Sequence, residues 1–315
     1  MSDLAQRLKI VISDAVARAA LRVPMLERAV VGGCRNEELR HALRLGAVAV
    51  GFTRVLRGRE LRVAQLGGYQ LQVNIAEELG TSQYFFGDPG TLWFTSKLIR
   101  EGDACVDAGA NVGHYCFQMA SQVGASGHVL AFEANPEFVL ILQNSAALNG
   151  YEPRIAVHSE ALYETSGEQM TFYVSVNSRN SGTSSLVNHG WFVQEDNAIT
   201  VNTVTLDDAA KRAGIDHFRL VKVDVERAKE FVIAGAHGLL SSKRIDFLIV
   251  ELHAGTEAQR RLLDHGYVGW LPKPEDRTIV PIEQIAPDTF GDFLFASPDK
   301  VEELKRLLAP IARMV

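Results

Sequence analysis

The sequence predicts an α/β fold built on a mostly parallel sheet, and three observations carry this prediction. Residues 104–108 form a short apolar run that ends in glycine and leads into a helical pattern from about residue 112. A second apolar run follows at residues 128–134. Residues 220–225 and 244–253 are two further strands, joined by a predicted crossover helix at residues 228–240, as a parallel connection requires.

The turn after the first strand has the composition of an anion-binding loop. Gly109 and Gly113 bracket it, and a side chain at either position would stand between the backbone and a ligand lying over the turn. The helix that follows offers unpaired N–H groups and a positive partial charge. Ala110, Asn111 and Val112 separate the glycines, so the G-x-G-x-x-G spacing of pyrophosphate binders is absent. The turn therefore favours a smaller, carboxylate-bearing ligand.

Glu133 lies near the end of the second strand, about 20 residues after the glycine turn. An acidic residue at this place accepts hydrogen bonds from ribose hydroxyls, and the geometry suits any adenosine ligand. A strand-end glutamate that touches only solvent is the alternative. The spacing between the glycine turn and Glu133 favours the ribose interpretation.

These two motifs, VDAGANVG at residues 106–113 and FEANP at 132–136, resemble the first two motifs of class I S-adenosylmethionine-dependent methyltransferases. The subfamily that the chain resembles is FkbM, whose pattern also matches at residues 183–186, 203–207, 221–226, 234–236 and 250–253. The resemblance extends over about residues 100–297. It implies a Rossmann-like, seven-stranded, mostly parallel sheet with an antiparallel terminal hairpin, in a domain that we place at residues 67–298.

The resemblance also implies S-adenosylmethionine as the cofactor and S-adenosylhomocysteine as the product. The residues expected to hold the donor are Asp107, Gly109, Asn111, Gly113, His114, Glu133, Ala134, Asn135, Glu160, Ala161 and Asp224. Glu160 and Ala161 are included because the end of the third strand, predicted at residues 155–162, faces the adenine in this fold. His114 is expected either to contact the donor's carboxylate or to be a packed helix residue.

Methylation of a hydroxyl requires a base, because the acceptor loses its proton as its oxygen takes the methyl group. The candidates at the ends of strands four and five are Asp224, Glu226, Glu251 and His253. The same group could hold a divalent cation, but no metal-ligand spacing is present and we expect none. Arg227 and Lys229 depart from the family pattern, which has a glycine and an acid there; a solvated helix face is the expected place of Lys229.

The function that the sequence favours is O-methylation of a hydroxyl on a sugar, polyketide or other natural-product-type small molecule. An N- or carboxyl-methyltransferase and a catalytically silent S-adenosylmethionine-binding domain remain alternatives. A net charge of −6 gives no basic field for nucleic acid, so the expected partner is a small-molecule or glycan acceptor. The long connection at residues 177–197 is expected to shape the acceptor pocket.

The N-terminal residues 1–66 are predicted as a helical extension, with an amphipathic helix at residues 2–22 and a second helical region from Asn36 to Leu56. These helices could mediate a homodimer. An aromatic segment at residues 80–94 is expected to pack on the core rather than to form a lid, and residues 299–315 to form a C-terminal helix. Three cysteines without disulfide spacing, together with the absence of a signal-peptide pattern or membrane span, indicate a cytoplasmic protein.

Overall fold

The structure of the protein is a computed structural model that describes residues 3–42, 45–56, 58–87, 93–175, 181–187, 193–311 and 313–314. The chain forms two compact units. The smaller comprises Met1–Pro89 and Ser175–Thr183, and the larger comprises Gly90–Val174 and Ser184–Val315. In the described part of the chain, no helix combines the length and the apolar character that crossing a bilayer requires.

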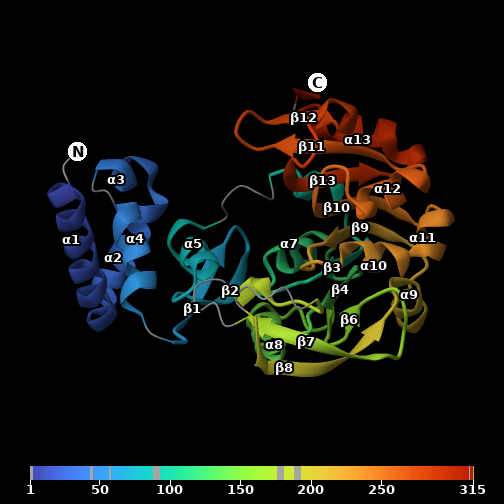
Figure 1. Ribbon diagram of the computed structural model, residues 1–315. Coiled ribbons are helices and arrows are strands. Elements are labelled where there is room, and N and C mark those ends of the chain that lie inside the picture. Colours follow the sequence, from blue (N-terminus) through green and yellow to red (C-terminus); the bar gives the residue numbers. More distant parts are fainter. Residues whose placement is uncertain are drawn as a thin grey trace. The chain divides into compact units, whose positions relative to one another are not determined.

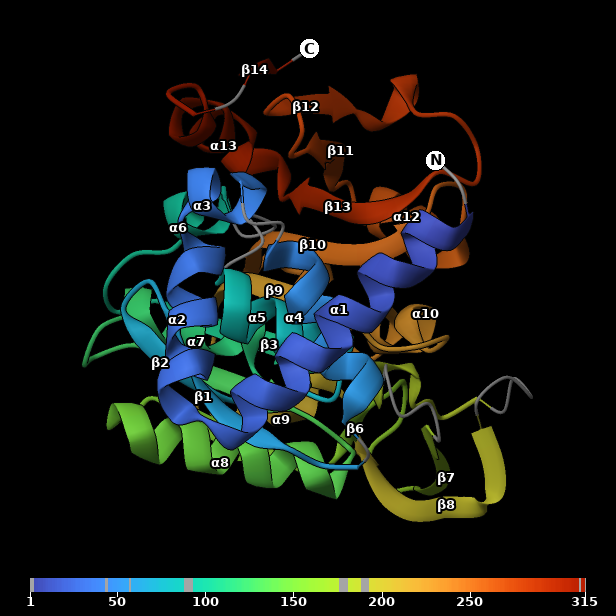
Figure 2. The same cartoon turned by 90° about the vertical axis from the view of Figure 1, so that its left-hand side faces the viewer.

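The smaller unit is helical with one β-hairpin (Figures 1 and 2). Its elements are α1 (Asp3–Arg22), α2 (Pro24–Arg35), α3 (Glu37–Ala42), α4 (Leu45–Val55), β1 (Leu61–Leu66), β2 (Tyr69–Asn74) and α5 (Glu78–Phe86). The predicted amphipathic helix is α1, which packs along α4, as Figure 2 shows. Helix α2 is an addition to the prediction, and Pro24 at its first position supplies a favourable start.

The second predicted helical region divides into α3 and α4. Asn36 precedes α3 and accepts a hydrogen bond at its Oδ1 from the backbone N–H of Leu39, at 3.0 Å. The aromatic side chains of α5 pack inward: Phe85 is fully buried, with its ring 4.6 Å from that of Phe52. The expectation that this segment packs on a core is confirmed for Phe85, whereas residues 88–92 lie outside the described residues.

The larger unit contains the central sheet. Its strands are β3 (Ala104–Ala108), β4 (His128–Phe132), β5 (Ile155–His158), β6 (Ala161–Leu162), β7 (Gln169–Ser175, whose last residue belongs to the smaller unit), β8 (Val193–Val204), β9 (Phe218–Val223), β10 (Ile245–His253), β11 (Val268–Lys273), β12 (Thr278–Pro281), β13 (Phe290–Ala296) and β14 (Arg313–Met314). Its helices are α6 (Thr95–Leu98), α7 (His114–Gln122), α8 (Pro136–Asn149), α9 (Leu206–Ala213), α10 (Lys229–Ala234), α11 (His237–Ser241), α12 (Glu257–Asp264) and α13 (Val301–Leu308).

The strands of the main sheet follow the order β14-β12-β11-β13-β10-β9-β3-β4-β5 in the described residues. From β5 to β10 neighbouring strands are parallel, and β13 runs antiparallel to both β10 and β11. Helices cover both faces: Figure 1 shows α7 on one side and α10, α11 and α12 on the other. This is the expected mostly parallel α/β sheet with its antiparallel terminal hairpin, extended at one edge by β12 and β14.

Two predicted elements are divided in the structure. The predicted third strand splits into β5 and β6, because β6 leaves the main sheet and pairs with Thr203 and Val204 of β8 in a separate sheet. The predicted crossover helix is two short helices, α10 and α11. They separate at Gly235, where an added Cβ would overlap the backbone carbonyl oxygen of Tyr163.

The unit boundary also differs from the sequence division at residues 66 and 67. Hairpin β1–β2 and helix α5 pack with each other and α5 packs with α2 and α4, so the smaller unit reaches Pro89. Residues 299–315 belong to the larger unit, where α13 contacts α6. The three cysteines Cys34, Cys105 and Cys116 are free, as their lack of disulfide spacing indicated, and all three are buried.

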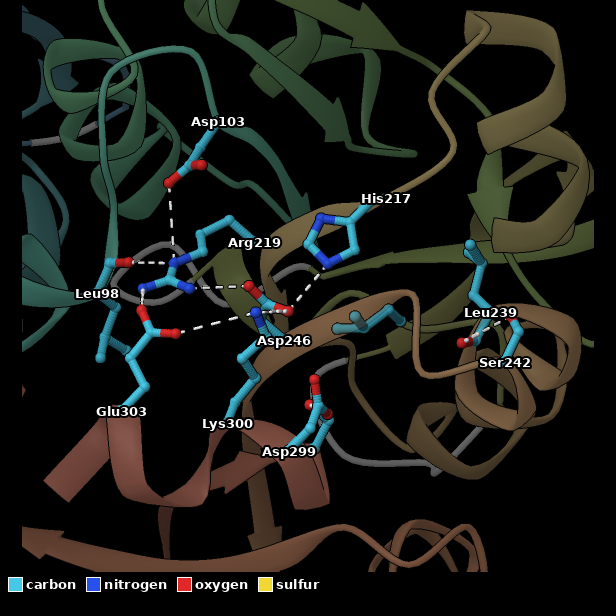
Figure 3. Close-up of polar contacts among 12 residues, drawn as sticks. Leu98, Asp103, His217, Arg219, Leu239, Ser242, Asp246, Asp299, Lys300 and Glu303 are labelled. Atoms are coloured by element: carbon cyan, nitrogen blue, oxygen red, sulfur yellow. Dashed lines mark hydrogen bonds and ion pairs between the residues drawn. The ribbon is translucent and has the colours of Figure 1, made fainter.

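Helix α13 is attached to the sheet by a buried ion network at the amino-terminal ends of β9 and β10 (Figure 3). Arg219 is 4% exposed, and its guanidinium donates to Asp246 Oδ2 at 2.8 Å, to Glu303 Oε1 at 2.6 Å and to the carbonyl oxygen of Leu98 at 2.6 Å. Asp246, 3% exposed, also faces His217 at 2.9 Å. A charge buried this deeply is tolerated only when it is paired and hydrogen-bonded.

Candidate active site

The strand order reverses between β3 and β9, which makes the carboxyl ends of these two strands the switch point of the sheet. In open α/β sheets ligands bind in the crevice outside such ends. The register places Asp107 of β3 opposite Lys222 of β9, and Asp224 follows directly after β9. The backbone N–H of Asp224 donates to the carbonyl oxygen of Ala108 at 2.9 Å. The ends of both strands are therefore held together at this point.

The glycines of the turn have a different physical reason from the one that the sequence suggested. Gly109 has φ +82°, and an added Cβ would overlap the backbone carbonyl oxygen of Asp224. Gly113 has φ +97°, and a Cβ there would overlap the ring of Phe117. Close approach of the chain to itself, together with the left-handed backbone, accounts for both glycines. A side chain at Gly109 would displace the strand ends as well as any ligand.

Glu133 ties the glycine turn to the end of β4. Its Oε2 accepts a hydrogen bond from the backbone N–H of Asn111 at 2.8 Å, and its Oε1 accepts from the N–H of Asn135 at 2.8 Å. Burial raises the pKa of Glu133 to about 7, although these backbone hydrogen bonds oppose the rise. A carboxylate oxygen is able to accept more than one hydrogen bond, so both oxygens of Glu133 are still able to accept hydrogen bonds from ribose hydroxyls.

Asn111 and Asn135, whose backbone N–H groups bind Glu133, also make local contacts of their own. Asn111 takes the left-handed conformation, with φ +51°, and its Oδ1 accepts from the N–H of Val112 at 2.7 Å. Asn135 caps α8, with its Oδ1 accepting from the N–H of Glu137 at 3.0 Å. Both residues shape the turn that surrounds Glu133.

Asp107 is a buried carboxyl with an unsatisfied atom. It is 2% exposed, and its Oδ2 has no hydrogen-bond partner among the described residues. Burial raises its pKa to about 7, while the charge of Lys222 opposes the rise. A buried oxygen without a partner is costly, which makes it a natural acceptor for a ligand's donor group.

Asp224 and Glu251 form a carboxyl pair across the ends of β9 and β10. The register of β9 and β10 pairs Val223 with Val250, so Asp224 and Glu251 follow on neighbouring strand ends, and each carboxyl affects the pKa of the other. Burial and the neighbouring Asp224 charge raise the pKa of Glu251 to about 7, whereas Lys222 lowers the pKa of Asp224 despite burial. Lys229 donates to Glu251 Oε2 at 3.1 Å and is 14% exposed. The expectation that Lys229 lies on a solvated helix face is therefore wrong, because its ammonium turns inward to this carboxylate.

His253 and Glu226 lie at the same edge. His253 is exposed at the end of β10, and its Nδ1 lies 3.1 Å from the carbonyl oxygen of Asp288. A carbonyl only accepts, so Nδ1 carries the proton and Nε2 presents a lone pair when the ring is neutral. Glu226 is half-buried, and its backbone oxygen accepts from the hydroxyl of Ser185 at 2.7 Å. That contact holds the matched segment 183–186 against the end of β9.

The remaining predicted donor residues lie farther along the strand ends. Glu160 follows β5 and pairs with both terminal nitrogens of Arg212, at 3.0 and 2.8 Å. Ala161 is buried in the small sheet, with Ala134 packed against the same cluster. His114 opens α7, with its ring 6.0 Å from that of Tyr115. Among the described residues, no three His, Cys, Asp or Glu side chains are grouped so as to hold a metal ion.

Three residues of this edge were not identified from the sequence: Lys222, Asp292 and Tyr115. The lysine donates to Asp292 Oδ1 at 2.5 Å and lies 4.9 Å from the centre of the Tyr115 ring. Its charged side chain stands between Val221 and Val223 in a strand of mainly apolar residues, and that position was the available signal. Asp292 lies on β13, opposite Glu251 in register, and only the fold brings it here.

Comparison with known proteins decides the family. The family described as the methyltransferase FkbM domain matches residues 107–275, more than half of the chain. The chain belongs to this family. The matched range contains the glycine turn, Glu133 and the Asp224–Glu251 pair, so the family assignment and the geometry concern the same part of the molecule.

Individual relatives of this FkbM-family chain are distant. It is 27% identical over 203 residues to the hexuronic acid methyltransferase AglP of Haloferax volcanii, covering 63% of this chain and 77% of that protein. The crystal structure of a methyltransferase FkbM from Methylobacillus flagellatus is 15% identical with a TM-score of 0.41, covering 89% of this chain and 60% of that one. A SAM-dependent O-methyltransferase from Thermotoga maritima is 14% identical with a TM-score of 0.35, covering 66% of this chain and 65% of that one.

Proposed function

We propose that this methyltransferase transfers the methyl group of S-adenosylmethionine to a hydroxyl oxygen of a sugar-containing acceptor. The observation that carries the proposal is the Asp224–Glu251 pair. Glu251 is a carboxyl whose pKa burial raises to about 7, and its neighbour Asp224 lies at the switch point beside the glycine turn. A base with this pKa is suited to remove a hydroxyl proton near neutral pH.

The residues at the turn fit the donor. The unsatisfied Oδ2 of Asp107 would accept a hydrogen bond from the donor's ammonium group, and Glu133 would accept from its ribose hydroxyls. S-adenosylmethionine, when bound, supplies a methyl group on a sulfonium sulfur, and the sulfur leaves as a neutral thioether when the methyl group is transferred. The protein's contribution is to align the acceptor oxygen with that carbon and to exclude competing geometries.

The acceptor's proton is the remaining problem. As the acceptor oxygen forms its bond to the methyl carbon, its O–H bond breaks and the proton passes to Glu251. Asp224 stays ionised beside it, and its charge favours the protonated form of Glu251. His253 is the second candidate base, because its Nε2 lone pair is available at the same edge.

Arg227 supports an anionic acceptor. It is exposed, directly follows Glu226, and holds the left-handed backbone with φ +56°, where the family has glycine. A non-glycine residue in this conformation is strained, and retained strain at a site favours a functional role. A guanidinium there is able to bind a carboxylate or phosphate with two hydrogen bonds. The similarity to a protein named as a hexuronic acid methyltransferase supports an acidic sugar.

The same two observations favour a second candidate, which is methylation of the acidic sugar on its carboxylate. A carboxylate has no proton to lose, so this reaction would not need Glu251 as a base. The bond formed would be an ester rather than an ether. The two candidates therefore differ in the chemical stability of the product.

We further propose that catalysis needs no metal. The carboxylates that a cation would require are already neutralised by lysines: Lys222 lies 3.5 Å from Asp224 Oδ2, and Lys229 lies 3.1 Å from Glu251 Oε2. Turnover should therefore survive EDTA. Loss of activity on chelation, with recovery on adding magnesium, would contradict this.

The test is methyl transfer from isotopically labelled S-adenosylmethionine to glucuronic acid glycosides and to the matching neutral glucosides. Hydroxyl methylation gives a product that keeps its label in mild alkali, and the acidic glycoside should be preferred. Label released by alkali would assign the carboxylate instead. No transfer to any glycoside would reject a sugar acceptor.

A further inference from the structure

Lys222 is a buried cation that lies at the point where the predicted chemistry takes place. It is 1% exposed and is the last residue but one of β9, a strand buried along its whole length. Its ammonium lies 2.5 Å from Asp292 Oδ1 and 3.5 Å from Asp224 Oδ2. A lysine is almost never buried this deeply unless it is paired.

The groups around this ammonium come from every neighbouring element. Asp107 lies opposite it on β3, and Asp292 contributes from β13. The ring of Tyr115 on α7 lies 4.9 Å away, and its hydroxyl donates to Asp292 Oδ2 at 3.4 Å. On β10 the facing acid is Glu251, which lies beyond Asp224 and is itself paired with Lys229 of α10.

We propose that Lys222 is a positioning residue for methyl transfer, whose buried ammonium keeps Asp224 ionised so that Glu251 is the carboxyl that takes the acceptor's proton. The inference rests on the proposed hydroxyl methylation, because only that reaction needs a base.

The physical reason is that Lys222 determines which of two adjacent carboxyl groups has the lower pKa. Two carboxyl groups that affect each other's pKa hold one proton between them over a range of pH, and the less stabilised anion receives it. Lys222 stabilises the Asp224 anion and lowers its pKa, so the proton is assigned to Glu251. Without Lys222, Asp224 would compete for the proton, and the pair would stay protonated to higher pH.

Asp292 provides a matched control, because its replacement should shift the pKa of Asp224 in the opposite direction. It shares the ammonium with Asp224, and it lies opposite Glu251 in the β10–β13 register. Replacement of Asp292 by asparagine leaves the whole charge of Lys222 to Asp224 and removes an anion near Glu251. The two substitutions, Lys222→Met and Asp292→Asn, should therefore move the titration of the carboxyl pair in opposite directions.

The experiment is a carboxyl carbon-13 NMR titration of the whole protein labelled in its aspartate and glutamate side chains. Signals are assigned with Asp224→Asn and Glu251→Gln. Lys222→Met should raise the apparent pKa of the Asp224 step by at least about one unit, the effect of losing an adjacent opposite charge. Asp292→Asn should lower it, because the whole charge of Lys222 then acts on Asp224. An unchanged Asp224 step in folded Lys222→Met would overturn the inference.

If Lys222→Met does not fold, Asp292→Asn and the double variant Lys222→Met/Asp292→Asn decide the question. The double variant removes both members of the buried ion pair, and an Asp224 step no higher in it than in Asp292→Asn would contradict the proposal. The acid limb of kcat should shift with the titration, whereas a merely structural lysine would lower kcat equally at all pH values. Inactivity of the wild type toward hydroxyl acceptors would reject the proposed function, while the titration would still decide the role of Lys222.

Discussion

The replacement of Glu133 by glutamine tests the donor site at its most constrained residue. Glu133 accepts from two backbone N–H groups, those of Asn111 and Asn135, both at 2.8 Å. A glutamine amide offers one acceptor and one donor, so one of these N–H groups would face an NH2 group. Hydrogen bonds to a charged group contribute about 1.5–3 kcal/mol each. The backbone contact is present with and without donor, so the loss in affinity comes from the ribose contact, and one such bond corresponds to roughly a 10- to 150-fold weakening.

The assay is isothermal titration calorimetry with S-adenosylhomocysteine, which removes catalysis from the measurement. Glu152→Gln is the matched control, because Glu152 is exposed after the end of α8 and should leave the affinity unchanged. Thermal denaturation of both variants reports whether the fold is retained. Equal affinities for Glu133→Gln and wild type would refute the assignment of Glu133 to the donor.

Three further predictions concern stability, backbone strain and pH. Arg219→Met should lower the free energy of unfolding by about 3–5 kcal/mol, since it removes the buried cation that pairs with both Asp246 and Glu303. The exposed pair of Arg244 should contribute at most about 1 kcal/mol in chemical denaturation, and equal losses would contradict the account. Arg227→Gly should raise the free energy of unfolding by about 1 kcal/mol, because glycine adopts the left-handed backbone without strain. The same substitution should raise KM for an anionic acceptor and leave donor affinity unchanged. An unchanged KM would show that Arg227 is not part of the acceptor site. Burial raises the pKa of Asp107 and Glu133 to about 7, so the folded state holds protons that the unfolded chain has released above about pH 4. The thermal stability of the donor-free protein should therefore fall as the pH rises towards 7, and calorimetry should show donor affinity rising from pH 6 to 8. A donor affinity or a thermal stability that does not change with pH would contradict this prediction.

The elements around the glycine turn were predictable because local signals determine them. Strand β3 has the bounds that the sequence indicated, Ala104–Ala108, since an apolar run there ends at a glycine. The division of residues 155–162 was not predictable. It depends on pairing with β8, about 40 residues later in the chain, and no local pattern reports such a contact.

The candidate site shows the same limit. Gly109 and Glu133 were identified from their spacing, but the reason for Gly109 is the carbonyl oxygen of Asp224, more than a hundred residues away. Lys222 and Asp292 meet only because β9 and β13 flank β10. Spacing along the chain predicts which motif is present, whereas partners across the sheet require the fold.

The most direct test of the central claim is the effect of Glu251→Gln on turnover. A general base contributes about 10²- to 10⁴-fold to rate, so kcat for a hydroxyl acceptor should fall within that range. Donor affinity should stay within about twofold of wild type, because Glu251 lies on β10, one strand beyond Asp224, whereas the proposed donor contacts are made by Asp107 and Glu133. His253→Gln, at the same edge, should retain most of the activity. A Glu251→Gln variant with wild-type kcat would contradict the assignment of the Asp224–Glu251 pair as the catalytic base.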